Sequence, residues 1–320
     1  MELELFAISI APITAVLGPT GAGKSELGLV LAEAFGGEIV NCDSVQVYAR
    51  LHIGSAKLPV SERRGIPHHL LDVIDLGEEL TAGAYARLAR SVIADIQKRG
   101  RVPVVVGGTG FYFRALFDGL SPAPTRDAEL RARLEIVGNR RPEVLYRFVR
   151  RFDPEAARRI HPNDHQKLIR AIELIYLARQ PATQTQSAPR EALVGARVLR
   201  LGLNPPRAEL YEQLNRRSAW MFGHGLLEET RSLLESGVSP SSKPLQSLGY
   251  RQAVKVLQGG CSLREAIAEC QTKTRQYAKR QMTWFRSEGE VQWLPGFGSE
   301  PEVQQKALHL CREFLRASPF

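Results

Sequence analysis

Cysteine is scarce in this sequence: 320 residues contain only Cys42, Cys261, Cys270 and Cys311. No two of them form a C-x-x-C pair, and none has a histidine partner at the spacing of zinc ligands. The pattern excludes a cysteine-based zinc site. We therefore expect four reduced, structural thiols and no protein cage for a metal ion.

Long hydrophobic runs are also absent. The apolar N-terminal stretch Leu5–Leu17 contains Pro12 and lacks a basic leader, and it is shorter than the roughly 20 residues that span a bilayer. Internal repeats are missing too. We expect a cytoplasmic protein with no membrane partner.

Acidic residues are too few to balance the basic ones. The chain has 43 Lys and Arg against 34 Asp and Glu, a net charge of +9, and 43% of its residues are hydrophobic. Counted by segment, the net charge is −2 over 1–120, +8 over 121–220 and +3 over 221–320. An excess concentrated in the middle third favours a polyanionic partner such as a nucleic acid. The alternative is a solvated, arginine-rich helical face.

One motif is specific. Residues Gly18–Ser25 read GPTGAGKS and fit G-x-x-x-x-G-K-[ST], in which backbone N–H groups surround phosphates and the lysine reaches the outer ones. Ile13–Leu17 predicts a buried strand before the motif. The helix predicted after it has apolar residues at i, i+3, i+4 and i+7 and ends at Gly36-Gly37; these residues are Leu27, Val30, Leu31 and Ala34. The sequence thus predicts a site for a diphosphate or triphosphate at a helix N-terminus.

The segments that follow narrow the chemistry. A nucleotide hydrolase needs an Asp at the end of an apolar strand to help hold magnesium, but Val102–Val106 runs into Gly107-Gly108-Thr109-Gly110. This argues against a motor or switch ATPase. Another predicted strand, Glu38–Cys42, leads into Asp43-Ser44-Val45-Gln46, at the kind of strand end where open α/β sheets bind ligands. Asp43 is therefore the candidate acid-base residue.

Alternating strand and helix signals over residues 1–120, including a helix from about Thr81 to Arg99, indicate an α/β fold: a P-loop NTPase-like parallel sheet with flanking helices. Residues 120–125 are rich in turn-forming residues, and a helical insertion is expected over 121–190. This insertion is expected to end in a Gln/Thr-rich loop at 180–187. Residues 191–320 would complete the core. They contain a predicted strand, 198–203, and a helix, 262–286, that starts at a capping box of Ser262 and Glu265.

Six motifs in one order make the chain resemble the tRNA dimethylallyltransferase (isopentenyl-tRNA transferase) family over about residues 13–295. They are Gly18–Ser25, Asp43–Tyr48, Pro67–Asp72, Gly107–Phe113, His161–Asp164 and Gly249–Gln252. Two departures are small: the family's loop often has Ala-Ser where this chain has Gly21-Ala22, and Ala is common at the position of Cys42. Neither removes a chemical group that the reaction needs.

The resemblance implies transfer of a dimethylallyl group from dimethylallyl diphosphate to the exocyclic amine of the adenosine 3′ to the anticodon in tRNA. Because diphosphate leaves, we expect the rate to depend on donors that stabilise negative charge: Lys24, Thr109, Arg217 and the N–H groups of Gly21–Ser25. Ser25 is expected to place its hydroxyl on a Mg²⁺ that substrate and water mainly hold. The complete expected diphosphate site is Gly18, Pro19, Thr20, Gly21, Ala22, Gly23, Lys24 and Ser25.

On the acceptor side, an aromatic amine gains positive charge as it attacks, so Asp43 can accept its proton. The alternative is that Asp43 orients a magnesium ion or caps the end of the strand. Ser44, Val45, Gln46 and Thr109 are expected to contact the tRNA nucleotide. His68 and His69 are expected to be structural or pocket-lining.

The tRNA anticodon stem-loop is the expected macromolecular partner, because its adenosine can be unstacked there. Tyr277 is predicted either to stack on a base or to pack on the core. The expected contacts are Arg131, Gln166, Lys167 and Arg170 in the insertion, and Arg275, Tyr277, Lys279, Arg280 and Gln281 in the C-terminal helix.

Three rival functions remain open at this stage. An enzyme that prenylates free adenine nucleotides would not need the basic middle segment. A small-molecule kinase would use Lys24, Ser25 and Asp43 for phosphoryl transfer. A non-catalytic RNA-binding module would leave the phosphate loop unexplained. We expect a monomer.

Overall fold

A six-stranded sheet forms around β1 (Pro12–Leu17), every residue of which is buried. The computed structural model describes residues 12–317, so residues 5–11 of the apolar N-terminal stretch lie outside the described part. The strand order is β3-β2-β4-β1-β5-β6 and all pairs are parallel. The other strands are β2 (Gly37–Cys42), β3 (His68–His69), β4 (Val102–Gly107), β5 (Arg197–Leu203) and β6 (Val291–Leu294). The expected parallel α/β sheet is confirmed, and each of the four predicted strands agrees within one residue at either end.

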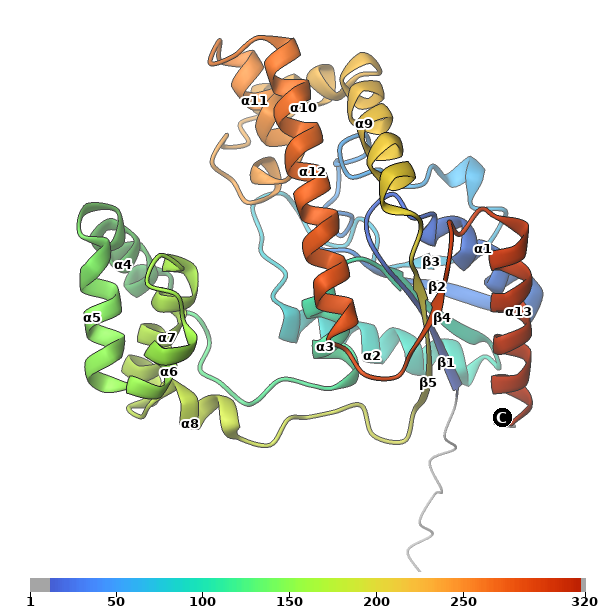
Figure 1. The fold of residues 1–320 in the computed structure, drawn as a ribbon, viewed down its shortest axis with the longest axis horizontal. Coiled ribbons are helices and arrows are strands. Elements are labelled where there is room, and N and C mark those ends of the chain that lie inside the picture. Colours follow the sequence, from blue (N-terminus) through green and yellow to red (C-terminus); the bar gives the residue numbers. More distant parts are fainter. Residues whose placement is uncertain (1–11, 318–320) are drawn as a thin grey trace, which may run out of the picture. The chain divides into compact units, whose positions relative to one another are not determined.

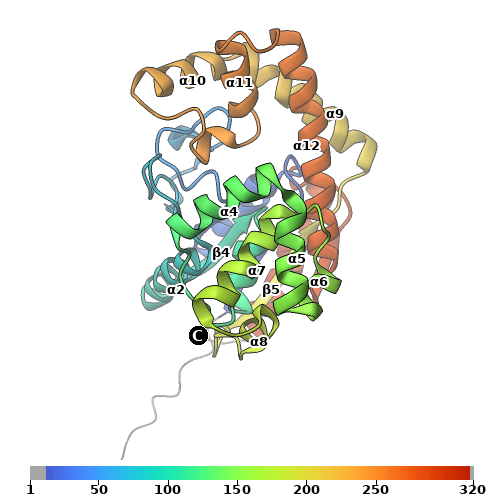
Figure 2. The same ribbon diagram turned by 90° about the vertical axis from the view of Figure 1, so that its left-hand side faces the viewer.

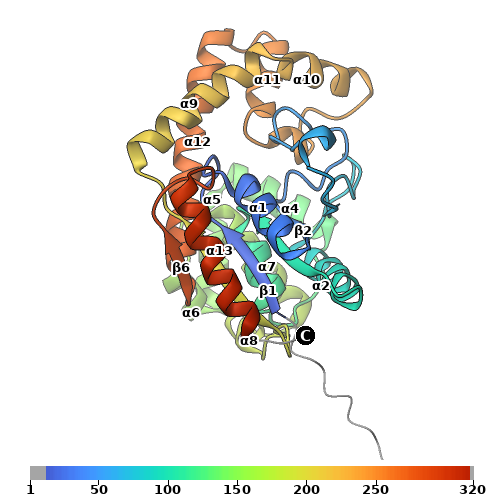
Figure 3. The same ribbon diagram turned by 90° about the vertical axis from the view of Figure 1, so that its right-hand side faces the viewer.

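The two faces of this sheet are covered differently. Helices α1 (Lys24–Phe35) and α13 (Pro301–Arg316) pack on one face and on each other, as Figure 3 shows. Helix α2 (Ala82–Lys98), capped by Thr81, covers the other face. It meets α3 (Gly110–Phe117) through a stack of Tyr85 on Tyr112, with centroids 4.1 Å apart.

Two details of the predicted α1 segment are wrong. Leu27 and Leu31 are buried as expected, but Val30 is half-buried and Ala34 is exposed. Helix α1 packs against both the sheet and α13. Its buried face therefore includes Leu29 and Ala32 in place of Val30 and Ala34. Gly36, with φ of 61°, ends the helix as predicted, whereas Gly37 is already the first residue of β2.

Four α-helices lie between β5 and β6 along the chain: α9 (Arg207–Gly223), α10 (Leu226–Glu235), α11 (Tyr250–Leu257) and α12 (Leu263–Arg286). Figure 1 shows α9 and α12 running beside each other, and α10 and α11 at one end of the pair. Short 3₁₀ turns occupy Val60–Glu62 and Pro244–Gln246. The capping box predicted at the start of α12 is confirmed, because Ser262 and Glu265 each accept the other's backbone N–H.

Residues 117–192 form a compact unit of their own, with a separate hydrophobic core. Its helices, green in Figure 2, are α4 (Ala128–Arg140), α5 (Pro142–Phe152), α6 (Pro154–Arg159), α7 (His165–Ala178) and α8 (Ala182–Ser187). The loop predicted at 180–187 is wrong, because α8 occupies most of it. Buried Ala182 and Thr185 hold α8 against the unit's core, and such packing outweighs the low helix propensity of Thr and Ser.

Among residues 12–317, no helix has both the length and the apolar character needed to cross a bilayer.

Candidate active site

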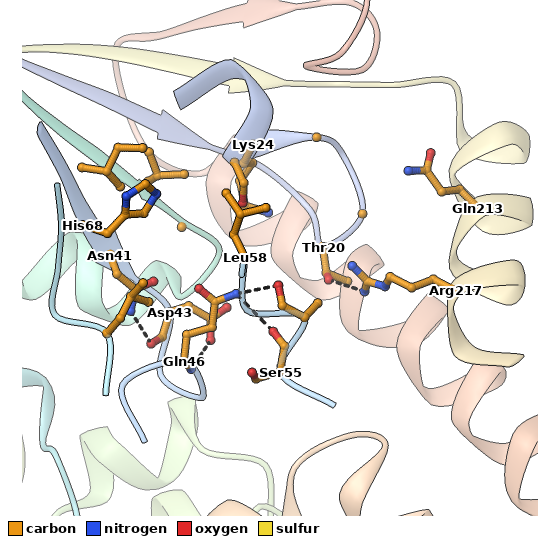
Figure 4. A pocket seen from close by; sticks show the side chains of 18 residues that line it. Thr20, Lys24, Asn41, Asp43, Gln46, Ser55, Leu58, His68, Gln213 and Arg217 are labelled. Carbon is orange, nitrogen blue, oxygen red and sulfur yellow. Dashed lines mark hydrogen bonds between the residues drawn. The ribbon is translucent and has the colours of Figure 1, made fainter. Parts of the chain in front are cut away.

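Three strands deliver functional residues to one edge of the sheet. β1 runs into the phosphate loop Gly18–Ser25, β2 ends just before Asp43, and β4 leads into Gly108 and Thr109. Because parallel strands end at the same edge, these segments meet there. A cavity of about 260 Å³ lies among them (Figure 4).

The phosphate loop needs glycine where other parts of the fold approach it closely. Gly21 and Gly23 have φ of 79° and 83°. A Cβ on Gly21 would lie 2.7 Å from Leu214 Cδ2, and one on Gly23 would lie 2.9 Å from the backbone nitrogen of Gly298. Gly23 also begins α1 without a side-chain cap, so no side chain competes with an anion for the first N–H groups of the helix.

Lys24 folds back over its own loop. Its Nζ donates to the carbonyl of Pro19 at 2.7 Å. Burial lowers the pKa of Lys24 to about 8, Asp43 acts in the opposite direction, and Arg217 lowers it further. The lysine therefore occupies a site that already favours the arrival of a negative charge.

Arg217 reaches the loop from α9. Its Nη2 donates to Thr20 Oγ1 at 2.7 Å (Figure 4), and burial lowers its pKa from the ordinary arginine value. Two cationic side chains, Lys24 and Arg217, thus line the cavity with the loop.

Asp43 caps the turn that follows β2. Its Oδ1 accepts the N–H of Val45 at 2.8 Å and that of Gln46 at 3.3 Å. Within residues 12–317, no hydrogen bond involves Oδ2. The strand-end capping that the sequence left as an alternative is therefore present, and the second oxygen is still available to accept a proton.

Thr109 and Gln46 connect the neighbouring loops. Thr109 Oγ1 accepts the N–H of Ser44 at 3.0 Å and donates to Ser44 Oγ at 3.3 Å. The Gln46 amide donates to the carbonyls of Ser55 and Ala56 (Figure 4), at 3.1 and 3.3 Å. The loops after β2 and β4 are therefore held to each other before any substrate is present.

A second cavity, of about 300 Å³, adjoins the first. Both are lined by Thr20, Asp43, Ser55, Ala56 and Arg217. Only the first is lined by Gly21, Gly23, Lys24 and Ser25, whereas the expected diphosphate residues Gly18, Pro19 and Ala22 line neither cavity. Only the second is lined by Ser44, Val45, Tyr277 and Arg280. Asp43 and Arg217 therefore stand where two compartments of different chemistry meet.

The expected tRNA contacts on α12 differ in their burial and in their hydrogen bonds. Gln281 is buried and bonds both the phosphate loop and Gly108. Arg275 donates to Asn215 Oδ1 at 2.6 Å, whereas Lys279 is exposed. Burial raises the pKa of Tyr277, and nearby Asp43 adds to this effect, so its hydroxyl stays protonated at neutral pH.

The other expected tRNA contacts belong to the unit 117–192. Arg131 Nε lies 2.9 Å from Glu173 Oε1, and Arg170 Nη1 lies 3.4 Å from Glu173 Oε2; the Glu173 side chain is fully buried. Lys167 is exposed and pairs with Asp164 at 2.8 Å, and Gln166 is exposed. No local pattern in the sequence indicated that the two arginines share one buried carboxylate.

His68 and His69 are pocket-lining and structural as expected, whereas several other cavity residues were not predicted. His68 lines the first cavity, whereas His69 Nε2 contacts Glu38 Oε2 at 2.6 Å. Gln213, one turn before Arg217 on α9, was detectable from that spacing. The remaining lining residues carry no local signal; they are Ile39, Asn41, Ser55, Ala56, Leu58, Leu71 and Val106.

Comparison with known proteins agrees with this geometry. A family model described as "IPP transferase" matches residues 46–288. The tRNA dimethylallyltransferases of Solibacter usitatus and Koribacter versatilis are each 52% identical to this chain, over 95% and 93% of it and over 99% and 97% of their own lengths.

Solved structures agree as well. The tRNA isopentenylpyrophosphate transferase of Bacillus halodurans has a TM-score of 0.71 at 32% identity, covering 97% of this chain and 98% of that one. A eukaryotic dimethylallyltransferase captured acting on tRNA has a TM-score of 0.81 at 29% identity, covering 97% and 81%. The resemblance found in the sequence is confirmed: this chain belongs to the IPP transferase family, that of the tRNA dimethylallyltransferases.

Proposed function

We infer that this enzyme transfers a dimethylallyl group from dimethylallyl diphosphate to the exocyclic amine of the adenosine 3′ to the anticodon in tRNA, giving isopentenyladenosine. Membership of the family over nearly the whole chain carries this conclusion. The placement of Asp43 between a phosphate-loop cavity and a second cavity supports it.

The first cavity suits the diphosphate of the donor. We propose that the N–H groups of Gly21–Ser25, together with Lys24 and Arg217, hold the phosphates and stabilise the charge that develops as the carbon–oxygen bond breaks. Thr109 belongs to the same group of expected donors. Its hydroxyl already bonds Ser44, so it serves best at the boundary with the acceptor.

Mg²⁺ is the divalent ion that we propose for this site. Among residues 12–317, no three His, Cys, Asp or Glu side chains gather as metal ligands. The hydroxyl of Ser25, at the start of α1, suits an ion bound chiefly by diphosphate oxygens and water. When bound, the ion would neutralise charge on the leaving diphosphate.

The second cavity suits the acceptor adenosine. As the exocyclic nitrogen bonds to the dimethylallyl carbon, the carbon–oxygen bond breaks and its electron pair leaves with diphosphate. The nitrogen then loses a proton, and we propose that Asp43 Oδ2 accepts it. Ser44 and Val45 line this cavity and would contact the nucleotide. Gln46 lines the first cavity; it would meet the nucleotide through its side-chain oxygen, because its amide nitrogen already donates to Ser55 and Ala56.

The anticodon stem-loop is the proposed partner for the exposed basic residues. Lys167, Lys279 and Arg280 are exposed cations suited to phosphate, and Tyr277 in the second cavity is placed to meet a base. We further propose that the enzyme acts as a monomer in the cytoplasm, where tRNA is modified; light scattering would give its molar mass in solution.

The deciding experiment follows radiolabelled dimethylallyl from its diphosphate, with Mg²⁺, into unmodified tRNA and, in parallel, into AMP. Label in tRNA alone is the expected result. Label in AMP would point to a nucleotide prenyltransferase. Label in neither substrate would contradict the proposal and call for assays of phosphoryl transfer from ATP.

A further inference from the structure

Gln281 on α12 joins two catalytic loops that lie far from it in the sequence. Its Oε1 accepts the N–H of Thr20 at 2.8 Å, across 261 residues, and its Nε2 donates to the carbonyl of Gly108 at 2.8 Å, across 173 residues. The side chain is 6% exposed. Thr20 belongs to the phosphate loop, and Gly108 precedes Thr109.

Only a primary amide of this length satisfies both loops. The Thr20 N–H requires an acceptor and the Gly108 carbonyl requires a donor. A glutamate would set a second acceptor against the Gly108 carbonyl, and a methionine would offer no partner to the part-buried Thr20 N–H or to the buried Gly108 carbonyl. A side chain at Gly108 would displace this amide, because a Cβ there would lie 2.4 Å from Gln281 Nε2.

Further hydrogen bonds hold the segments around this bridge together. Thr20 is held a second time, through its hydroxyl, by Arg217 of α9. Helices α9 and α12 are tied together by Arg275, which donates to the Asn215 side chain, and by Gln271, which donates to the Asn215 carbonyl at 3.1 Å. One helical turn before Gln281, Tyr277 lies close enough to Thr109 and Gln281 for both side chains to lower the pKa of its hydroxyl, against the larger effect of burial.

We propose that Gln281 is a positioning residue that holds the phosphate loop in register with the Gly108-Thr109 loop, and so holds the prenyl donor in register with the acceptor adenosine. It acts through the Thr20 N–H and the Gly108 carbonyl. This inference rests on the proposed function. It differs from the expectation that Gln281 contacts tRNA, because both ends of its amide already bond the enzyme itself.

The test compares Gln281→Met and Gln281→Glu with Gln276→Met, a matched control at an exposed position of the same helix. For each variant we would measure kcat at saturating donor and tRNA, the Kd for tRNA, the Kd for inorganic diphosphate and the Tm. Small misplacements of reacting groups cost about 10- to 100-fold in rate. Both Gln281 variants should therefore lose about that much in kcat and bind diphosphate more weakly. Their tRNA affinity should change by less than about twofold, and Gln276→Met should behave as wild type.

Two results would overturn the proposal. One is weaker tRNA binding with kcat unchanged, as expected for a tRNA contact. The other is wild-type kcat and diphosphate affinity with at most a lower Tm, as expected for a purely structural residue. If Gln281→Met fails to fold, Gly108→Ala answers the same question, because its methyl group displaces the Gln281 amide without any change to residue 281 itself. If wild type transfers no label, the proposed function fails, and the diphosphate affinities still test the bridge.

Discussion

Asp43 has one carboxylate oxygen in use and the other available for the proton transfer proposed above. Oδ1 caps the turn at Val45 and Gln46, which fixes the direction of the side chain, while Oδ2 remains to accept a proton. A substitution that removes the whole carboxylate would therefore confuse the loss of a base with the loss of a turn. Asparagine separates the two, because its oxygen can still accept both N–H groups.

We predict that Asp43→Asn lowers the transfer rate by about 10²–10⁴-fold, the usual contribution of a general base, and changes tRNA affinity little. Single-turnover transfer at saturating tRNA, together with filter binding, measures both quantities. Asp43→Ala should lose the same rate and also some stability. An Asp43→Asn enzyme with wild-type rate would exclude Asp43 as the proton acceptor.

Lys24 predicts a pH dependence of diphosphate binding. Burial lowers its pKa to about 8 in the free protein, so the amine is charged below pH 8 and increasingly neutral above it. A bound diphosphate raises this pKa again, and binding above pH 8 must therefore take up a proton. Affinity should fall as pH rises above 8, by up to about tenfold per unit.

Calorimetry of inorganic diphosphate binding, in two buffers with different ionisation enthalpies, reports the proton uptake directly. Lys24→Met should bind weakly and lose this uptake above pH 8. An uptake that persists in Lys24→Met would assign the titration to another group.

At the scale of elements, the buried carboxylate of Glu173 organises two helices. Arg131 comes from α4, and Arg170 and Glu173 come from α7. The two arginines expected to meet tRNA therefore also neutralise a carboxylate inside the unit 117–192. Their substitution tests folding as well as binding.

We predict that Arg131→Ala lowers the free energy of unfolding by about 1–3 kcal/mol, because it leaves a buried charged acceptor short of a partner. Lys167→Ala, on the exposed surface of α7, should cost less than about 1 kcal/mol. Denaturation of the full chain in urea measures both. Equal losses in the two variants would contradict the idea that Glu173 depends on Arg131.

At the scale of the whole molecule, charge and chemistry occupy different stretches of the chain. Residues 1–120, which hold the phosphate loop and Asp43, carry a net charge of −2, whereas residues 121–220 carry +8. Long-range attraction of a polyanion therefore belongs mainly to the middle third of the sequence.

It follows that tRNA affinity should depend steeply on salt, with each phosphate contact adding about −0.7 to −0.9 to the slope of log K against log salt. Lys167→Ala and Lys279→Ala should each flatten that slope by about one contact and leave single-turnover transfer at saturating tRNA unchanged. Binding titrations between 50 and 200 mM salt, the range in which such losses become large, measure the slope. A slope that neither substitution changes would remove both lysines from the interface.

The sequence by itself determined the parallel α/β core, the phosphate loop between β1 and α1, the position of Asp43 at the end of β2 and the family. These follow from rules that act over a few residues: hydrophobic periodicity, helix capping and the chemistry of a Gly-rich turn. Six motifs in order added the family, because each requires particular residue types at particular spacings.

Tertiary structure alone decided which side chains meet across the fold. It brought Gln281 to Thr20 and Gly108, Arg217 to Thr20, and both Arg131 and Arg170 to Glu173. It also made 182–187 a helix and turned Ala34 toward solvent. The physical reason is that these outcomes depend on packing between segments distant in the chain, and local propensity contains no information about which distant segment will arrive.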